Sequence, residues 1–181
     1  MKFKFVVKTT EQDYIDYNIF SMTRSPYGKK QIRNMRCVIA VCFAIIVLMS
    51  FYGGGFNLST ALGLIPQTIL FALAQILLIK VFTWAFKSGI RAMKKNGKMG
   101  YSPESVIEFY EESFIETTPE NKSEQKYFAI ERISIVDNKM IYIHVNNVLA
   151  YIIPLSCFES KQQYDDFIEF IKTKCSNIDV Y

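Results

Sequence analysis

The stretch from Cys37 to Ile79 reads CVIAVCFAIIVLMSFYGGGFNLSTALGLIPQTILFALAQILLI and contains no Asp, Glu, Lys or Arg. Roughly a quarter of an average globular chain is charged, so 43 consecutive uncharged residues exclude an ordinary soluble domain. The stretch holds two apolar runs, residues 37–56 and 61–86, with turn-forming residues between them over 53–60. About 20 helical residues cover the hydrocarbon core of a bilayer, so the pattern predicts a transmembrane hairpin over residues 37–86.

Basic residues flank this hairpin at its shared end, whereas the connecting segment carries no charge. Lys and Arg in short flanking segments stay on the cytoplasmic side of a membrane. We therefore expect a multi-pass protein of the cell membrane with both termini in the cytoplasm and residues 53–60 outside. The same side chains are candidates for contact with anionic lipid headgroups. They are Lys29, Lys30, Arg33 and Arg36 before the hairpin, and Lys87, Arg91, Lys94, Lys95 and Lys98 after it.

Small and polar residues inside the two runs are candidates for helix–helix contacts. Ala40 and Ala44 form a small-xxx-small pair in the first run, and Gln67 and Gln75 lie in the second. Small residues let helix backbones approach closely, and a glutamine can form a hydrogen bond across helices. A transport path usually needs an ionisable residue at membrane depth, and these runs contain none, so we interpret the polar residues as packing contacts.

The segments on either side differ in charge. The net charge of +4 combines +5 in residues 1–36, +6 in residues 80–98 and −7 in residues 99–181. An acidic domain does not suit the phosphate backbone of nucleic acids, so we expect lipid, a protein partner or a second copy of the chain as neighbours, and no nucleic acid.

Residues 1–36 are expected to form a cytoplasmic strand and helix that lead into the membrane. Lys2–Lys8 alternates charged and apolar residues, as a short strand does. Thr9 or Thr10, followed three residues later by an amide or acid, predicts a capped helix start.

Residues 99–181 are expected to form a small β-rich domain closed by a helix. Strand candidates are residues 106–109, 114–118, 128–135, 140–145 and 148–153, with turns at Asp137-Asn138 and Asn146-Asn147. Lys122-Ser123 is expected in a polar loop. Ser160 suits the cap of a helix over 161–174, and the apolar residues of that helix recur on one face toward the sheet: Tyr164, Phe167, Ile168, Ile171 and Cys175. The predicted class is thus α+β, a transmembrane hairpin followed by an antiparallel β domain.

The residues that could perform chemistry are few. His144 is the single histidine, and its place in a strand beside Ile143 and Val145 predicts that it points to solvent. Glu111-Glu112 and Asp165-Asp166 are expected on solvated faces, because adjacent side chains point apart. No Cys-x-x-Cys and no phosphate-binding loop occur, so we expect no metal, no cofactor and no enzyme.

Two patterns of residues stand out at the two ends of the chain: Phe5…Thr9-x-x-Gln12-Asp13-Tyr14 and Ile152-Ile153-Pro154-x-x-x-Phe158-x-Ser160…Phe167-Ile168. They resemble the YcxB-like proteins, which are small bacterial membrane proteins. The resemblance implies a C-terminal part similar to a pleckstrin-homology domain, which has seven strands and a helix, and it carries no catalytic residues.

Three functions remain open from the sequence. We favour a non-enzymatic binding or scaffold module anchored at the cytoplasmic face of the bacterial inner membrane. The alternatives are envelope defence or immunity against membrane-active peptides, and an accessory subunit of a membrane complex.

Overall fold

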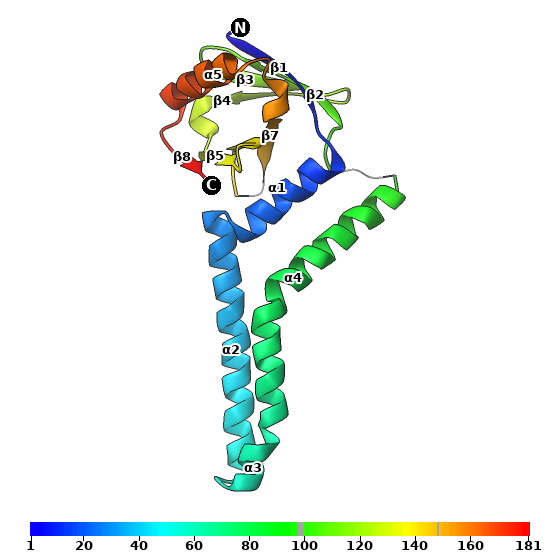
Figure 1. The fold of residues 1–181 in the computed structure, drawn as a ribbon, viewed down its shortest axis with the longest axis vertical. Coiled ribbons are helices and arrows are strands. Elements are labelled where there is room, and N and C mark those ends of the chain that lie inside the picture. The colour runs from blue at the N-terminus through cyan, green and yellow to red at the C-terminus, as the bar shows by residue number, and fades with distance from the viewer. Residues whose placement is uncertain (98–99, 148) are drawn as a thin grey trace. The chain divides into compact units, whose positions relative to one another are not determined.

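The chain forms two compact units (Figure 1), described here from a computed structural model that covers residues 1–97, 100–147 and 149–181. One unit, called the β domain below, comprises Met1–Asn18 and Met93–Tyr181. The other, called the helical hairpin, comprises Ile19–Ala92. The class is α+β, as the sequence predicts.

The helical hairpin consists of two long helices joined by a short one. They are α2 (Pro26–Gly54), α3 (Leu58–Gly63) and α4 (Ile65–Lys95). Ser25 caps α2 by accepting a hydrogen bond from the Gly28 amide at 2.9 Å, and Gly55 ends it with a φ of 72°. The expected connecting loop is therefore partly helical, because α3 begins at Leu58.

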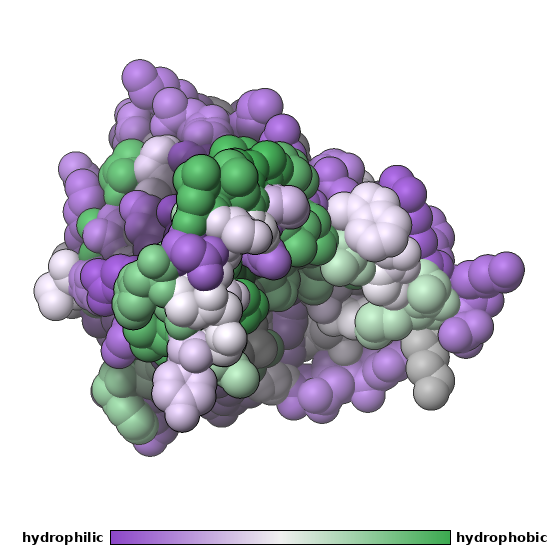
Figure 2. Space-filling model, turned by 90° about the horizontal axis from the view of Figure 1, so that it is seen from below, coloured by the Kyte–Doolittle hydropathy of each residue, from purple (hydrophilic) through white to green (hydrophobic). Residues whose placement is uncertain are grey.

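The hairpin presents apolar side chains rather than burying them. Both long helical stretches are long and apolar enough to cross a membrane, and within the described residues no part of their most apolar windows is buried. Apolar side chains also gather at the tip, seen end-on in Figure 2. Phe56 and Leu58 are 91% and 75% exposed there. An exposed apolar surface of this extent is unusual for a soluble protein.

The chain begins with β1 (Phe3–Lys8) and α1 (Glu11–Thr23). The predicted helix start is confirmed, with Thr10 as the cap. The Asp13 amide donates to the Thr10 hydroxyl at 3.1 Å, and the Thr10 amide donates back to the Asp13 carboxylate at 2.8 Å. This reciprocal pair satisfies two backbone donors that the first turn would otherwise leave free.

Two four-stranded sheets build the β domain. Sheet A has the order β1-β2-β3-β4, and sheet B has the order β7-β6-β5-β8. All neighbours are antiparallel except β5 and β8. The remaining strands are β2 (Glu104–Phe109), β3 (Ser113–Thr117), β4 (Lys122–Lys126), β5 (Arg132–Val136), β6 (Met140–His144), β7 (Ala150–Pro154) and β8 (Ile178–Val180).

Three details of the sequence-based strand assignment need correction. Lys122 and Ser123 do not lie in a loop but begin β4. The expected strand over residues 128–135 is interrupted by a short helix, η1 (Tyr127–Ala129), before β5 starts. A final strand, β8, pairs with β5 and was not expected. The turn at Asp137-Asn138 is confirmed, because both residues have the positive φ that such turns need.

An aromatic core fills the space between the sheets and α5 (Lys161–Lys174). The Phe167 ring lies 5.1 Å from that of Phe5 and 4.9 Å from that of Phe109. The predicted cap and packing face of α5 are confirmed, since the Gln163 amide donates to the Ser160 hydroxyl and Phe167 and Ile171 are fully buried. The helix therefore closes the core by its apolar face.

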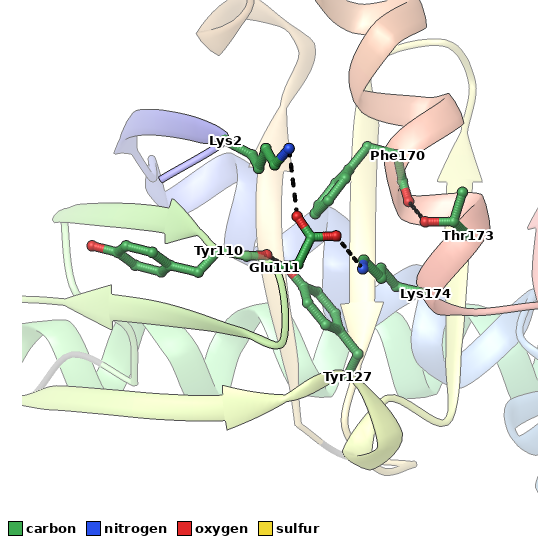
Figure 3. A network of polar contacts seen from close by, with 7 residues as sticks. All are labelled: Lys2, Tyr110, Glu111, Tyr127, Phe170, Thr173 and Lys174. Atoms are coloured by element: carbon green, nitrogen blue, oxygen red, sulfur yellow. Dashed lines mark hydrogen bonds and ion pairs between the residues drawn. The ribbon is translucent and has the colours of Figure 1, made fainter.

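A small polar cluster ties α5 to one end of sheet A (Figure 3). The Glu111 carboxylate, in the turn between β2 and β3, pairs with Lys2 at 3.4 Å and with Lys174 at 3.1 Å. The Tyr127 hydroxyl donates to the Tyr110 carbonyl at 2.8 Å beside them. The hydrogen bond from Lys174 lowers the pKa of Glu111. Glu111 is still 65% exposed, so the cluster positions the segments more than it stabilises them.

The sequence-based prediction for His144 is wrong, because the side chain is fully buried. It does point to the opposite face from Ile143, but Tyr17 of α1 covers that face, with its ring 6.1 Å from the His144 ring. The His144 Nε2 lies 3.2 Å from the Ser134 hydroxyl. Burial, together with the nearby Arg132, lowers the pKa of His144 to about 4. The histidine is therefore neutral at physiological pH.

Candidate functional site: a polar pocket in the β domain

The inner face of sheet A changes from apolar to polar along its strands. At one end Phe109 pairs with Phe114, and both are fully buried in the core. Glu116 lies two positions after Phe114 on β3, on the same face, and it pairs with Ser123 of β4. Paired positions in a sheet share a face, so a carboxyl and a hydroxyl occupy places where a core residue is expected.

A pocket of about 540 Å³ opens at this polar end. It lies wholly within the β domain, between sheet A, β7, the first part of α1 and the segment before β2. Its described lining is rich in hydroxyl and amide groups. The lining residues are Thr9, Tyr14, Tyr17, Asn18, Gly100, Tyr101, Ser102, Ser105, Glu116, Thr118, Asn121, Ser123, Leu149, Ala150, Tyr151 and Ile152.

Glu116 dominates the electrostatics of the pocket. Among the described lining residues it is the one ionisable carboxyl, and no Lys, Arg or His accompanies it. Burial raises the pKa of Glu116, and a hydrogen bond from the buried Ser105 partly opposes this rise. A half-buried carboxylate that lacks a cationic neighbour in its pocket is costly, since burying a charge disfavours the ionised form.

Tyrosine rings from three segments complete the walls. Tyr14 of α1 stacks on Tyr101, with ring centroids 5.0 Å apart, and Tyr17 lies one helical turn beyond Tyr14. Tyr151 of β7 is buried, and this burial raises the pKa of its hydroxyl. Side-chain hydrogen bonds with Ser123 and Gln125 lower that pKa and offset part of the rise. The pocket thus combines aromatic rings with hydrogen-bonding groups, as small-molecule sites do.

The segment before β2 passes close to this wall, and a glycine permits it. A Cβ on Gly100 would lie 2.6 Å from the Tyr14 hydroxyl. A larger residue would push Tyr14 away from its place beside Tyr101. The absence of a side chain at residue 100 therefore shapes the pocket.

The sequence-predicted basic residues lie outside this pocket. Lys29, Lys30, Arg33 and Arg36 are exposed on the first part of α2. On α4, Arg91 and Lys95 are exposed and Lys87 is half-buried, while Lys94 forms an ion pair with Glu11. Lys98 lies outside the described residues.

The predicted helix–helix contacts occur only in part. The side-chain amide of Gln75 donates to the Arg36 carbonyl at 3.2 Å, which joins α4 to α2. Gln67, Ala40 and Ala44 are exposed instead. The face of α2 that meets α4 contains Phe43, whose ring stacks on Phe71 at 4.4 Å. Large aromatic side chains rather than small residues therefore set the approach of the two helices.

Sequence reasoning missed the pocket, although a signal exists. Glu116 and Thr118 follow Phe114 at alternate positions, and Ser123 and Gln125 alternate in the next strand. Polar residues on a face that is apolar further along the strand indicate a cavity.

Within the described residues, no group of three or more His, Cys, Asp or Glu is placed to hold a metal ion.

A comparison with protein families finds a match to the model described as YcxB-like protein, over residues 109–171. The match runs from the end of β2 into the last turn of α5 and confirms the family resemblance seen in the sequence. No curated protein and no solved structure matches the chain.

Proposed function

We propose that this chain, whose residues 109–171 are similar to YcxB-like proteins, is a non-enzymatic binding module anchored in the cytoplasmic membrane of a bacterium. In this proposal α2 and α4 cross the bilayer, both termini and the β domain lie in the cytoplasm, and the segment around Gly55 reaches the outside.

One observation carries the anchoring: the hairpin exposes its apolar side chains and has cations at one end only. The tip between α2 and α4 is uncharged, whereas exposed Lys and Arg occur where α2 begins and where α4 ends. The positive-inside rule then favours the cytoplasm for that end. Those cations also support contact with anionic headgroups, for which the exposed Lys30 is more available than Lys94, which is paired with Glu11.

The polar pocket supports binding as the task of the β domain. Its lining offers hydroxyls, amides and a carboxyl in a concave space large enough for a small molecule. His144, the single histidine, is enclosed under α1 and is not among the described lining residues, which argues against histidine-based acid–base catalysis there.

The strand order supports the finer proposal of a pleckstrin-type domain. Seven described strands precede α5, and a sheet of four is followed by the antiparallel β5, β6 and β7. The lone strand β1 belongs to this arrangement because it pairs with β2.

Reporter fusions to the full chain test the anchoring. Alkaline phosphatase, which is active only outside the cytoplasm, is fused after Tyr181 in one protein and inserted after Gly55 in another. We expect no activity at Tyr181 and strong activity at Gly55. Activity at Tyr181 would overturn the proposed orientation. A matched protein with Lys29, Lys30, Arg33 and Arg36 replaced by Gln is expected to lose part of this asymmetry.

A further inference from the structure

We propose that the polar pocket binds a small organic amine, with Glu116 as the counter-ion of a single ammonium group and the tyrosine rings around its apolar body. This inference deepens the proposed function and rests on the β domain being a binding module. It does not depend on the orientation of the hairpin in the membrane.

The charge of the lining selects the sign of the ligand. Glu116 contributes one negative charge, and the described lining holds no cationic side chain to neutralise it. A half-buried carboxylate is stabilised when a cation enters beside it, whereas an anionic ligand would add like-charge repulsion. Because Glu116 is the one carboxyl among the described lining residues, the pocket offers a counter-ion for one ammonium group and not for the several ammonium groups of a polyamine.

The groups around Glu116 suit the donors of a primary ammonium. An ammonium group has three N–H donors and no acceptor. Besides the Glu116 carboxylate, the hydroxyls of Ser123 and Thr118 and the amide oxygen of Asn121 are acceptors in the same lining. Ser105 already donates to Glu116, so it holds the carboxylate in place for a ligand.

The remaining walls suit an apolar or aromatic body. Tyr14, Tyr101 and Tyr151 bring rings to the pocket, and Leu149 and Ile152 add aliphatic surface. Aromatic rings attract both cations and other rings, so they favour an aryl-alkyl amine over a bare ammonium ion. A volume of about 540 Å³ accommodates a molecule of this kind.

Three probes of similar size and different charge test the inference on the full chain in lipid nanodiscs. Phenethylamine is a cation, 2-phenylethanol is neutral, and phenylacetate is an anion. Binding is followed at pH 7.5 by the methyl NMR shifts of Ile152 in the pocket, with Ile135 of the core as the internal reference. We expect phenethylamine to bind at least about tenfold more tightly than 2-phenylethanol, and phenylacetate to give no shift.

Two variants separate the pocket from partition into lipid. Glu116→Gln keeps the shape of the side chain and removes the charge, so it is expected to abolish the preference for the amine. Glu124→Gln, on the outer face of β4, is expected to bind as the unmodified chain does. A thermal melt of each variant checks that it is folded.

The outcomes are distinct from those of the reporter fusions. Equal binding of phenethylamine and 2-phenylethanol, or an amine preference that survives in Glu116→Gln, would overturn the amine inference. Absence of a shift at Ile152 with all three probes would also overturn it. None of these results changes where alkaline phosphatase is active, so the anchoring proposal stands or fails separately.

Discussion

Acidification is expected to destabilise the β domain through one side chain, His144. The folded protein holds this histidine neutral, with its pKa lowered to about 4 from 6.5, first by burial and then by Arg132. In the unfolded chain the same imidazole regains its ordinary pKa. Between pH 6.5 and pH 4 the unfolded state therefore binds a proton that the folded state does not.

The size of the effect follows from the two pKa values. The stability contributed by the neutral, buried His144 is fully present above pH 6.5, falls as the pH drops and levels off near pH 4. A difference of 2.5 pKa units corresponds to about 3 kcal/mol in total, of which about 2 kcal/mol is lost by pH 5. At pH 5 most surface carboxylates are still ionised. The raised pKa of Glu116 acts in the opposite direction, so comparison with a variant that lacks His144 isolates the histidine contribution.

Because the chain has a single histidine, the assay reports one site. Imidazole nitrogen NMR of the full chain in detergent, without added histidine tags, is expected to show no protonation of the folded state down to pH 5. Chemical unfolding, followed by tyrosine circular dichroism, is expected to lose about 2 kcal/mol between pH 7 and pH 5.

The matched variant His144→Gln removes the titrating group. It is expected to be less stable at pH 7, but its stability should change little between pH 7 and pH 5. Arg132→Gln is expected to raise the pKa of His144 only in part, since burial is the larger cause. A folded-state pKa of 6 or above, or equal pH slopes for the unmodified chain and His144→Gln, would refute the reasoning.

Three further perturbations have defined outcomes. Phe167→Ala is expected to lower the free energy of unfolding by about 3–5 kcal/mol, while the exposed Phe128→Ala changes it little; denaturant titration distinguishes them. Gly28→Ala is expected to lower the free energy of unfolding in SDS by about 1–3 kcal/mol, because the new Cβ would lie 2.3 Å from a backbone oxygen. The control Gly89→Ala is expected to be neutral or stabilising, because its Cβ meets no described atom within 4 Å. Phenethylamine affinity is expected to fall as the pH drops through the raised pKa of Glu116, and pH-independent affinity in NMR titration would contradict it.

The sequence predicts the parts of this fold whose signal is local. The uncharged run over residues 37–79 needs no tertiary information to read as a hairpin, and Thr10 with Asp13 defines a helix start by spacing alone. The face of α5 is predicted for the same reason, since the repeat of Phe167, Ile168 and Ile171 is a property of one helix.

The sequence fails where a neighbour far along the chain decides the environment. His144 is buried by Tyr17, which lies before the helical hairpin in the chain, and no local pattern near His144 indicates that cover. The strand β4 has no apolar residue at all, and its inner position Ser123 lines the pocket rather than the core. The pocket itself was missed for this reason, as hydrophobic alternation detects packed faces only.

The pairing of β1 with β2 has a consequence for biosynthesis. Residues 3–8 emerge from the ribosome before the hairpin, whereas their partner, residues 104–109, follows only after the whole hairpin has been made. Sheet A can therefore be completed only after the hairpin has been made, and under the proposed anchoring the hairpin can enter the bilayer while β1 is still unpaired. A fragment starting at residue 99 would lack this strand and leave the edge of β2 open to aggregation, so a stable excised domain needs residues 1–18 rejoined to it.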